Sequence, residues 1–211
     1  MNIGAILVVL IIILFSMVLH ELAHGVVAYV LGDTTAKDEG RLSLNPLKHL
    51  DPFISVILPL VMYLMGGPIF GGAKPVPINT RNLKWGAWGM ALVAIAGPAT
   101  NFVLALLSFL LGHYTGLIYH TDLVGVAFQE MVFANLGFMI FNLIPIPPLD
   151  GSRVLYAIAP DGARRFMEQM ERGTGLMVVL LLVLVFGTAL SKLMSGAMMG
   201  ILRFFEMLVG M

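Results

Sequence analysis

One short motif near the N-terminus combines residue types and spacing that suit metal-assisted hydrolysis. It reads His20-Glu21-Leu22-Ala23-His24, an H-E-x-x-H pattern. On a helix, side chains four residues apart share a face, with Cβ atoms about 5–6 Å apart, so both imidazoles can bind one Zn²⁺ at about 2.0–2.1 Å. Glu21 then stands where a carboxylate can act as general base toward a metal-bound water. With five His and six Glu in 211 residues, chance gives about 0.003 matches to this pattern.

The motif lies inside an apolar stretch. Residues 1–32 carry only one Asp, Glu, Lys or Arg, which is Glu21, and residues 26–32 continue the apolar run for about two helical turns. An ionisable side chain at the centre of a span costs about 2.5–3.5 kcal/mol unless it is paired or functional. The alternative, that His20, Glu21 and His24 are interfacial residues at the end of a helix, does not account for this continuation.

A catalytic zinc takes three protein ligands and keeps one position for water, so the motif needs a partner. We favour Asp150, because it follows the uncharged stretch 131–149 and closes the run N-L-I-P-I-P-P-L-D-G at 142–151. The prolines of this run break a helix, and irregular backbone at membrane depth must line a protein cavity. The alternative for Asp150 is an ordinary turn residue before a glycine. Other candidates are His49 and the charges of the loop 33–51, which suit a solvated loop, and His113 and His120, which flank another loop.

The composition places the rest of the chain in a membrane. Charged residues make up 11% of the chain, against about 25% in soluble proteins, and the mean hydropathy is +0.95. A soluble domain of this size could not bury so much apolar surface, so a soluble enzyme is excluded. Lys and Arg together number 12, as do Asp and Glu, so no basic excess exists to bind nucleic acid. The chain has no Cys, which excludes disulfides and Cys ligands.

Apolar runs of about 20 residues predict an all-α polytopic membrane protein. We expect four transmembrane helices, at about residues 3–31, 87–112, 123–146 and 174–191. The first is no cleaved signal peptide, because it lacks a basic n-region and an A-x-A-like cleavage site. Residues 161–172 predict a short amphipathic surface helix. Residues 192–211 either extend the last helix or lie along the membrane surface.

The basic residues predict the topology. They flank the apolar segment 52–73 on both sides and recur in the loop 147–173, whereas the loop 113–122 has none. By the positive-inside rule, both flanks of 52–73 and the loop 147–173 are cytoplasmic, and the N-terminus is outside. The segment 52–73 is therefore predicted to be re-entrant, which its prolines and Gly pairs also favour. The same topology puts Asp150 on the side of the H-E-x-x-H motif, so the two inferences agree.

Several motifs together resemble one family. The sequence is similar to the site-2 protease family of intramembrane zinc metalloproteases over roughly residues 16–160, in the right order. The matching stretches are H-E-L-A-H at 20–24, G-R-L-S-L-N-P-L-K-H-L-D-P at 40–52, A-K-P-V-P-I-N at 73–79, G-P-A-T-N at 97–101 and the run at 142–151. The chain departs from larger members, because neither 113–122 nor 192–211 leaves room for a PDZ or cystathionine-β-synthase-type domain.

The resemblance implies one membrane-embedded peptidase domain over residues 1–211, with a core of about 3–160. The implied site consists of His20, His24 and Asp150 as ligands of one Zn²⁺, with Glu21 as the catalytic acid/base. The expected partners are the lipid bilayer and single-span membrane proteins that serve as substrates. The expected location is the plasma membrane of a prokaryote, with the active site toward the cytoplasm, and no oligomeric state is predicted.

Three asparagines lie in the predicted spans. The resemblance implies that Asn142 lies near the active site and helps to hold the substrate backbone, and the alternative is a helix–helix hydrogen bond. For Asn101 and Asn135 we favour helix–helix hydrogen bonds, which are worth about 0.6–2 kcal/mol in membranes.

Two other functions use the same residues without hydrolysis, namely a membrane carrier of metal ions and a scaffold that binds membrane helices. A carrier has no need of Glu21 directly after the first His, and its ligands usually lie along several helices. A scaffold would tolerate the loss of Glu21 or of a ligand, and none is missing. The sequence therefore favours an intramembrane zinc endopeptidase.

Overall fold

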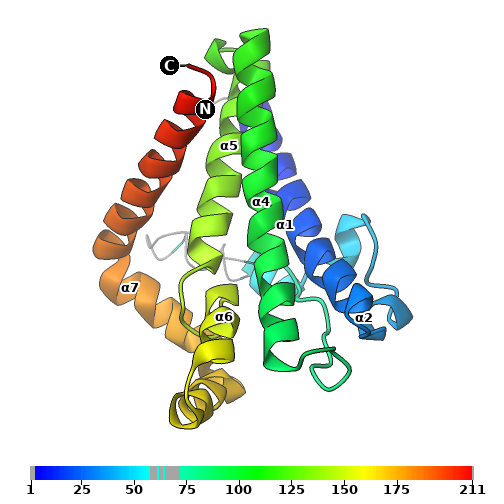
Figure 1. Ribbon diagram of the computed structural model, residues 1–211. Coiled ribbons are helices and arrows are strands. Elements are labelled where there is room, and N and C mark those ends of the chain that lie inside the picture. The colour runs from blue at the N-terminus through cyan, green and yellow to red at the C-terminus, as the bar shows by residue number, and fades with distance from the viewer. Residues whose placement is uncertain (1–2, 58–60, 62–63, 65–71, 211) are drawn as a thin grey trace.

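Four long helices dominate the computed structural model of the protein (Figure 1), which describes residues 3–57, 61, 64 and 72–210. The helices long and apolar enough to cross a membrane are α1 (Ile3–Val30), α4 (Ala87–Thr115), α5 (Leu123–Asn142) and the part Met177–Leu208 of α7 (Asp161–Leu208). The described residues contain no strand. The predicted all-α polytopic fold with four spans is therefore confirmed.

Helices α1, α4 and α5 pack against one another as a bundle, which we call the three-helix bundle (Figure 1). The buried faces of α1 and α4 carry many small residues, including Gly25, Ala28, Ala94, Gly97 and Ala105. Small residues let the backbones of membrane helices approach closely, and van der Waals packing then holds the helices together in lipid.

Helix α5 ends at Asn142, before the predicted bound of about 146. Pro145 has no N–H to continue the helical hydrogen bonds, and it disfavours the helical conformation of the residue before it. The chain therefore leaves the helix and turns through residues 143–149 into α6 (Asp150–Ile158), so Asp150 is the first residue of a helix.

The bounds predicted for residues 161–172 and 174–191 are wrong, because both segments belong to one 48-residue helix, α7. No Pro interrupts α7, and a glycine within an apolar helix weakens it by about 1 kcal/mol without ending it. Of the two alternatives for residues 192–211, extension of the last helix is confirmed as far as Leu208.

Helix α7 contacts other helices near both of its ends. Near its N-terminus it packs on α6, where Tyr156 Oη donates a hydrogen bond to Glu168 Oε1 at 2.6 Å. This contact explains why the amphipathic segment is no separate surface helix. Near the C-terminus, the buried Phe205 lies against Phe102 and Phe109 of α4, with ring centroids 5.6 and 5.5 Å away.

The chain between α1 and α4 forms the short helices α2 (Thr35–Asp38), η1 (Pro46–Lys48) and η2 (Pro52–Ile57). Most of the segment 52–73 lies outside the described residues, so its re-entrant path stays a prediction. The described flanks of this segment lie next to each other. Ser55 Oγ donates to Gly72 O at 2.6 Å, and Lys74 N donates to His49 O at 2.8 Å.

Candidate metal centre

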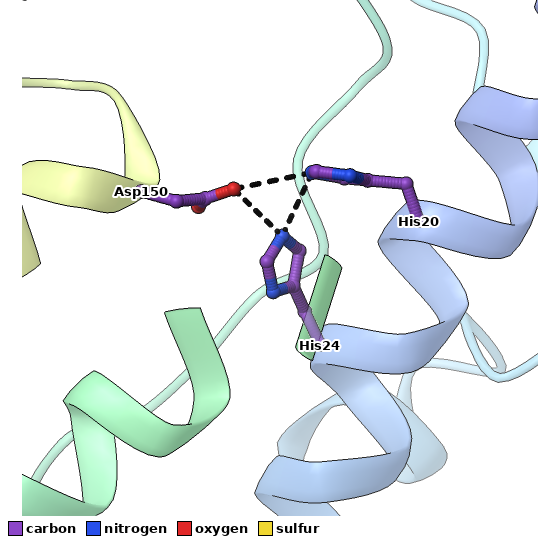
Figure 2. A group of neighbouring side chains, drawn as sticks. All are labelled: His20, His24 and Asp150. Carbon is purple, nitrogen blue, oxygen red and sulfur yellow. Dashed lines mark hydrogen bonds and ion pairs between the residues drawn. The ribbon is translucent and has the colours of Figure 1, made fainter. Parts of the chain in front are cut away.

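Three side chains from distant parts of the chain meet at one point, as Figure 2 shows. His20 Nε2 and His24 Nε2 lie 3.0 Å apart, and Asp150 Oδ2 lies 3.2 Å from the former and 3.3 Å from the latter. The histidines lie one turn apart on α1, and Asp150 opens α6. Within the described part of the chain, this is the one group of His, Cys, Asp and Glu side chains close enough together to hold a metal ion.

The triangle of ligand atoms has the dimensions of a zinc site. Two ligand atoms at about 2.0–2.1 Å from a tetrahedral zinc lie about 3.3 Å from each other, close to the distances that the structure shows. Asp150 Oδ2 is buried and receives no hydrogen bond. A buried carboxylate oxygen in this state is costly unless a cation neutralises it. The donor set and its spacing therefore fit Zn²⁺, which two imidazoles and one carboxylate bind readily.

Hydrogen bonds on the far side of each imidazole determine which nitrogen faces Asp150. His24 Nδ1 lies 2.7 Å from Val93 O, and His20 Nδ1 lies 2.6 Å from Asn101 Oδ1. Both partner atoms are acceptors, so each Nδ1 carries a hydrogen, and Nε2, which faces Asp150, is the nitrogen left to bind a metal. Metal-ligating histidines in proteins commonly show this arrangement.

Helix α4 approaches the histidines through a glycine. A Cβ added to Gly97 would lie 2.5 Å from His24 Nε2 and 2.6 Å from His20 Nε2. Contacts this short do not occur, so any other residue would push the imidazoles aside. Asn101 lies one turn after Gly97 on the same helix face and accepts the hydrogen bond from His20. The stretch G-P-A-T-N therefore supplies both the space for the imidazoles and an acceptor for one of them.

Glu21 lies beside the histidines and, like them, lines the cavity into which the site opens. Its Oε2 accepts a hydrogen bond from Val76 N at 2.9 Å. Val76 belongs to residues 74–79, which form neither helix nor strand and which we call the bridging segment. The carboxylate of Glu21 is therefore held in place by a backbone N–H.

Two buried charged side chains hold the bridging segment. Arg41 Nη2 donates to Lys74 O at 2.9 Å, and Asn79 N donates to Asp33 Oδ2 at 2.7 Å. Burial alone would raise the pKa of Asp33, but hydrogen bonds from the Thr35 hydroxyl and from backbone N–H groups outweigh burial and hold this pKa below its ordinary value of 3.8. Asp33 is therefore a carboxylate at neutral pH.

The metal centre opens into a cavity of about 1500 Å³. The cavity is bounded by the three-helix bundle on one side and by the middle of α7, between Val183 and Met198, on the other. Asn142 also lines the cavity, and its Nδ2 donates to Phe138 O within its own helix at 3.0 Å. The described hydrogen bond of Asn142 is thus not the helix–helix bond considered as its alternative.

The other histidines named as candidates lie away from the metal centre. His49 is buried in the loop after α2, where its Nε2 lies 2.7 Å from Ser43 O. His113 lies at the far end of α4, with Nδ1 2.7 Å from Tyr119 Oη. His120 Nδ1 lies 3.7 Å from Asp122 Oδ2.

The sequence interpretation of Asn101 was incomplete. The favoured helix–helix hydrogen bond exists, because Asn101 Nδ2 donates to Asn135 Oδ1 at 2.8 Å. The contact of Asn101 with His20 was missed. Its signal in the sequence is the spacing of Gly97 and Asn101, which puts a polar side chain on a helix face that also needs a glycine.

Comparison with known proteins yields one family and several relatives. The family description "Peptidase family M50" matches residues 118–186, a range that includes Asn142 and Asp150. The chain is 39% identical over 208 residues to the Bacillus subtilis (strain 168) protein named "Putative zinc metalloprotease YwhC". This match covers 95% of the chain and 90% of the relative.

More distant relatives carry the name "Putative zinc metalloprotease Rip2". The protein of this name from Mycolicibacterium smegmatis is 35% identical over 173 residues, which are 81% of this chain and 64% of that protein. The one from Mycobacterium tuberculosis (strain H37Rv) is 36% identical over 151 residues, which are 67% of this chain and 53% of that protein. No solved structure gives a significant match.

Proposed function

The chain belongs to peptidase family M50, and from this premise we propose that it is a zinc endopeptidase that cuts membrane-spanning helices within the bilayer. One observation carries the proposal. The two histidines of a membrane-embedded H-E-x-x-H motif and the first residue of α6 converge on one point that suits a metal ion, with Glu21 beside them. Hydrolysis of a peptide bond by metal-activated water uses such a set of metal ligands with a neighbouring carboxylate.

The proposed roles follow from the contacts of each side chain. His20, His24 and Asp150 hold the zinc, which when bound supplies an acidified water and a Lewis acid for the scissile carbonyl. Glu21 takes a proton from the attacking water and returns it to the leaving amine nitrogen. The hydrogen bond from Val76 N keeps the carboxylate of Glu21 oriented for both transfers.

The depth of the site supports cleavage within the membrane. Helix α1 has 28 residues and is about 42 Å long, so a centred helix exceeds the hydrocarbon core of about 30 Å by about 6 Å at each end. His20 precedes the end of α1 by about ten residues, or about 15 Å. In a centred helix perpendicular to the membrane, the metal centre would thus lie about 9 Å inside the hydrocarbon core, where a membrane-spanning helix is the available peptide.

The cavity supports a helical segment as substrate. Its α7 wall contributes apolar residues such as Val183, Leu184 and Leu190, which suit the side chains of a membrane helix. A helix shields its carbonyl groups by internal hydrogen bonds, so the segment to be cut must unwind near the metal.

The bridging segment is a suitable partner for an unwound substrate. It lies along the cavity, which Val76 and Ile78 line, and an extended chain can pair with it as an added strand. Replacement of Ile78 by Pro removes one backbone donor, so we expect slower cleavage with unchanged zinc content. Ile78→Ala keeps the donor and serves as control. Cleavage by Ile78→Pro at the rate of Ile78→Ala would contradict strand pairing.

The protein is a multi-pass membrane protein by its four apolar helices. We place the active site on the cytoplasmic side, because the positive-inside rule puts the basic flanks of 52–73 and the loop 147–173 there. Labelling of single cysteines introduced into the loop 113–122 and after α6 tests this orientation in intact cells.

The decisive experiment measures zinc content and cleavage of single-span substrates in liposomes. We expect about one zinc and cleavage for the wild type, zinc without cleavage for Glu21→Gln, and loss of both for Asp150→Ala. Glu39→Gln, which changes an exposed carboxylate after α2, is the matched control and should behave as wild type. If Glu21→Gln cuts as well as wild type, the protease assignment is wrong. Zinc bound through the three ligands without cleavage of any substrate would favour a carrier or a scaffold.

A further inference from the structure

A chain of buried polar side chains leads from His20 into the interior of the three-helix bundle. Asn101 on α4 accepts from His20 and donates through Nδ2 to Asn135 Oδ1 on α5, at 2.8 Å. Asn135 Nδ2 in turn donates to Ser16 Oγ on α1 at 2.9 Å and to Met131 O at 2.7 Å. Ser16, Asn101 and Asn135 are each 0% exposed, so water cannot substitute for any of these partners.

The donor and acceptor order along these hydrogen-bonded side chains is determined at Met131, the end farthest from His20. Met131 O is a backbone carbonyl and can only accept, so the group that Asn135 turns toward it must be the NH₂. Asn135 Oδ1 is then the atom that faces Asn101 and receives its Nδ2. Asn101 Oδ1 is left for His20, and a carbonyl oxygen there requires a hydrogen on His20 Nδ1. The backbone of α5 thus fixes the tautomer of a histidine on α1.

The two histidines differ in how their tautomers are fixed. His24 Nδ1 faces Val93 O, a backbone acceptor that cannot turn around. His20 Nδ1 faces a side-chain amide, which could rotate by 180° and offer its NH₂ instead. Such a rotation would favour the tautomer with a hydrogen on Nε2, the atom that faces Asp150 and that a metal needs unprotonated.

We propose that Asn135 is a positioning residue for the metal centre: through Asn101 it holds His20 in the tautomer that can bind the metal, although its own described hydrogen bonds go to Asn101, Ser16 and Met131. The proposal rests on the metal site proposed above and goes beyond it, because it assigns a role to a buried residue on a third helix. Asn135 is therefore more than a link between helices, the interpretation that the sequence favoured.

The test compares Asn135→Leu with two further variants. Leu has the same branched arrangement of heavy atoms as Asn but forms no hydrogen bond, so Asn101 loses the partner that orients it. We expect zinc affinity, measured by competition with a chelator, to fall about 10–100-fold, as for other partners of metal-ligating histidines. In the zinc-free protein, ¹⁵N NMR of the imidazoles should show a hydrogen partly on Nε2 of His20, with His24 unchanged.

Asn135→Asp should restore the wild-type affinity and tautomer, because a protonated carboxyl group donates to Met131 O and still accepts from Asn101. Thr100→Val is the control. It removes a hydroxyl that donates to Ala96 O within α4, and this hydrogen bond is not one of those that link His20 to Asn135. A loss of zinc in all three variants, or in Asn135→Asp as much as in Asn135→Leu, would mean a merely structural role and overturn the proposal.

Two outcomes separate this proposal from the one it rests on. If the wild type binds no zinc, the metal site itself is wrong. If the wild type binds zinc, and Asn135→Leu binds it equally tightly with His20 unchanged in its tautomer, the metal site stands and the positioning role of Asn135 is overturned.

Discussion

The two walls of the cavity are built in different ways. On the side of the three-helix bundle, α1, α4 and α5 meet through small residues and buried hydrogen bonds, and Gly97 leaves the imidazoles no spare room. On the other side, α7 is fastened near Glu168 and near Phe205, while residues between Val183 and Met198 face the cavity. His20, His24 and Glu21 lie on the first wall, and Asp150 lies on α6, which packs against α4 of that wall. Space for a substrate of variable sequence lies beside the second wall.

The protein thus uses one wall to position the residues of the metal centre and the other to accommodate a substrate. Metal ligands and their partners must stay within a fraction of an ångström of the productive geometry, so they belong on tightly packed elements. A substrate of varying sequence needs a wall that can adapt. A helix packed near its ends, with exposed apolar side chains such as Leu184 and Val185 along the cavity, meets that need.

Gly97→Ala should abolish zinc binding. The new Cβ would lie 2.5–2.6 Å from the ligand nitrogens of both histidines, so the imidazoles must move away from Asp150. Gly196→Ala on α7 is the matched control, because its added Cβ has no atom within 4 Å apart from its chain neighbours and the nearby backbone of its own helix. This control should keep its zinc and gain up to about 1 kcal/mol of helix stability. Equal zinc content in the two variants, measured by atomic emission, would refute a difference between the walls.

Phe205→Ala should release the C-terminal end of α7. We expect a loss of about 3 kcal/mol, the low end of the cost of a large-to-small change in a soluble core, because lipid rather than water surrounds this helix. Hydrogen exchange should accelerate over the last turns of α7, while zinc content stays that of the wild type. Faster exchange in α1 or α4 as well would show that α7 supports the metal side, contrary to our comparison.

Asp33→Asn tests the anchor of the bridging segment through its pH dependence. Because the pKa of Asp33 is lowered in the folded protein, its contribution to stability is full above the ordinary value of 3.8 and is lost as pH falls through the folded-state pKa. We therefore expect the variant to be about 1–2 kcal/mol less stable near neutral pH, with the difference shrinking below about pH 4. A difference independent of pH, in denaturation at several pH values, would contradict this.

Leu184→Ala should have the smallest effect on the fold. Leu184 lies in the middle of α7 with 58% of its surface exposed, so its truncation should change the unfolding free energy by less than about 0.5 kcal/mol. It also lines the cavity, so the KM for a single-span substrate should change while zinc affinity does not. An altered zinc affinity would show that the α7 wall and the metal ligands are coupled.

The spans and the spacing of the proposed ligands His20 and His24 could be predicted from sequence, because each has a local signature. Apolar length marks a span, and the four-residue spacing marks His20 and His24. Asp150 needed a second argument, the agreement of its topology with the distribution of basic residues. The continuity of α7 had no such signature, since composition changes at about residue 173 although the helix does not stop.

The hydrogen bonds that support the histidines were not predictable from local pattern. Asn101 and Asn135 lie on different helices from His20, and only the packing of three helices brings the side chains together. The contacts of Arg41 and Asp33 with the bridging segment were not predictable from local pattern either. Charged loop residues usually remain in solvent, whereas tertiary contacts bury these two.

The separation of the proposed ligands along the chain has a thermodynamic consequence. With zinc bound, the ion cross-links α1 to α6 across a closed loop that contains α4 and α5, in a protein that has no cysteine for a disulfide. A ligand that binds only the folded state stabilises it by about 2.7 kcal/mol when free zinc exceeds the dissociation constant a hundredfold. The zinc that supports hydrolysis would thereby also stabilise the folded state. Removal of zinc by a chelator should therefore lower the melting temperature as well as abolish cleavage.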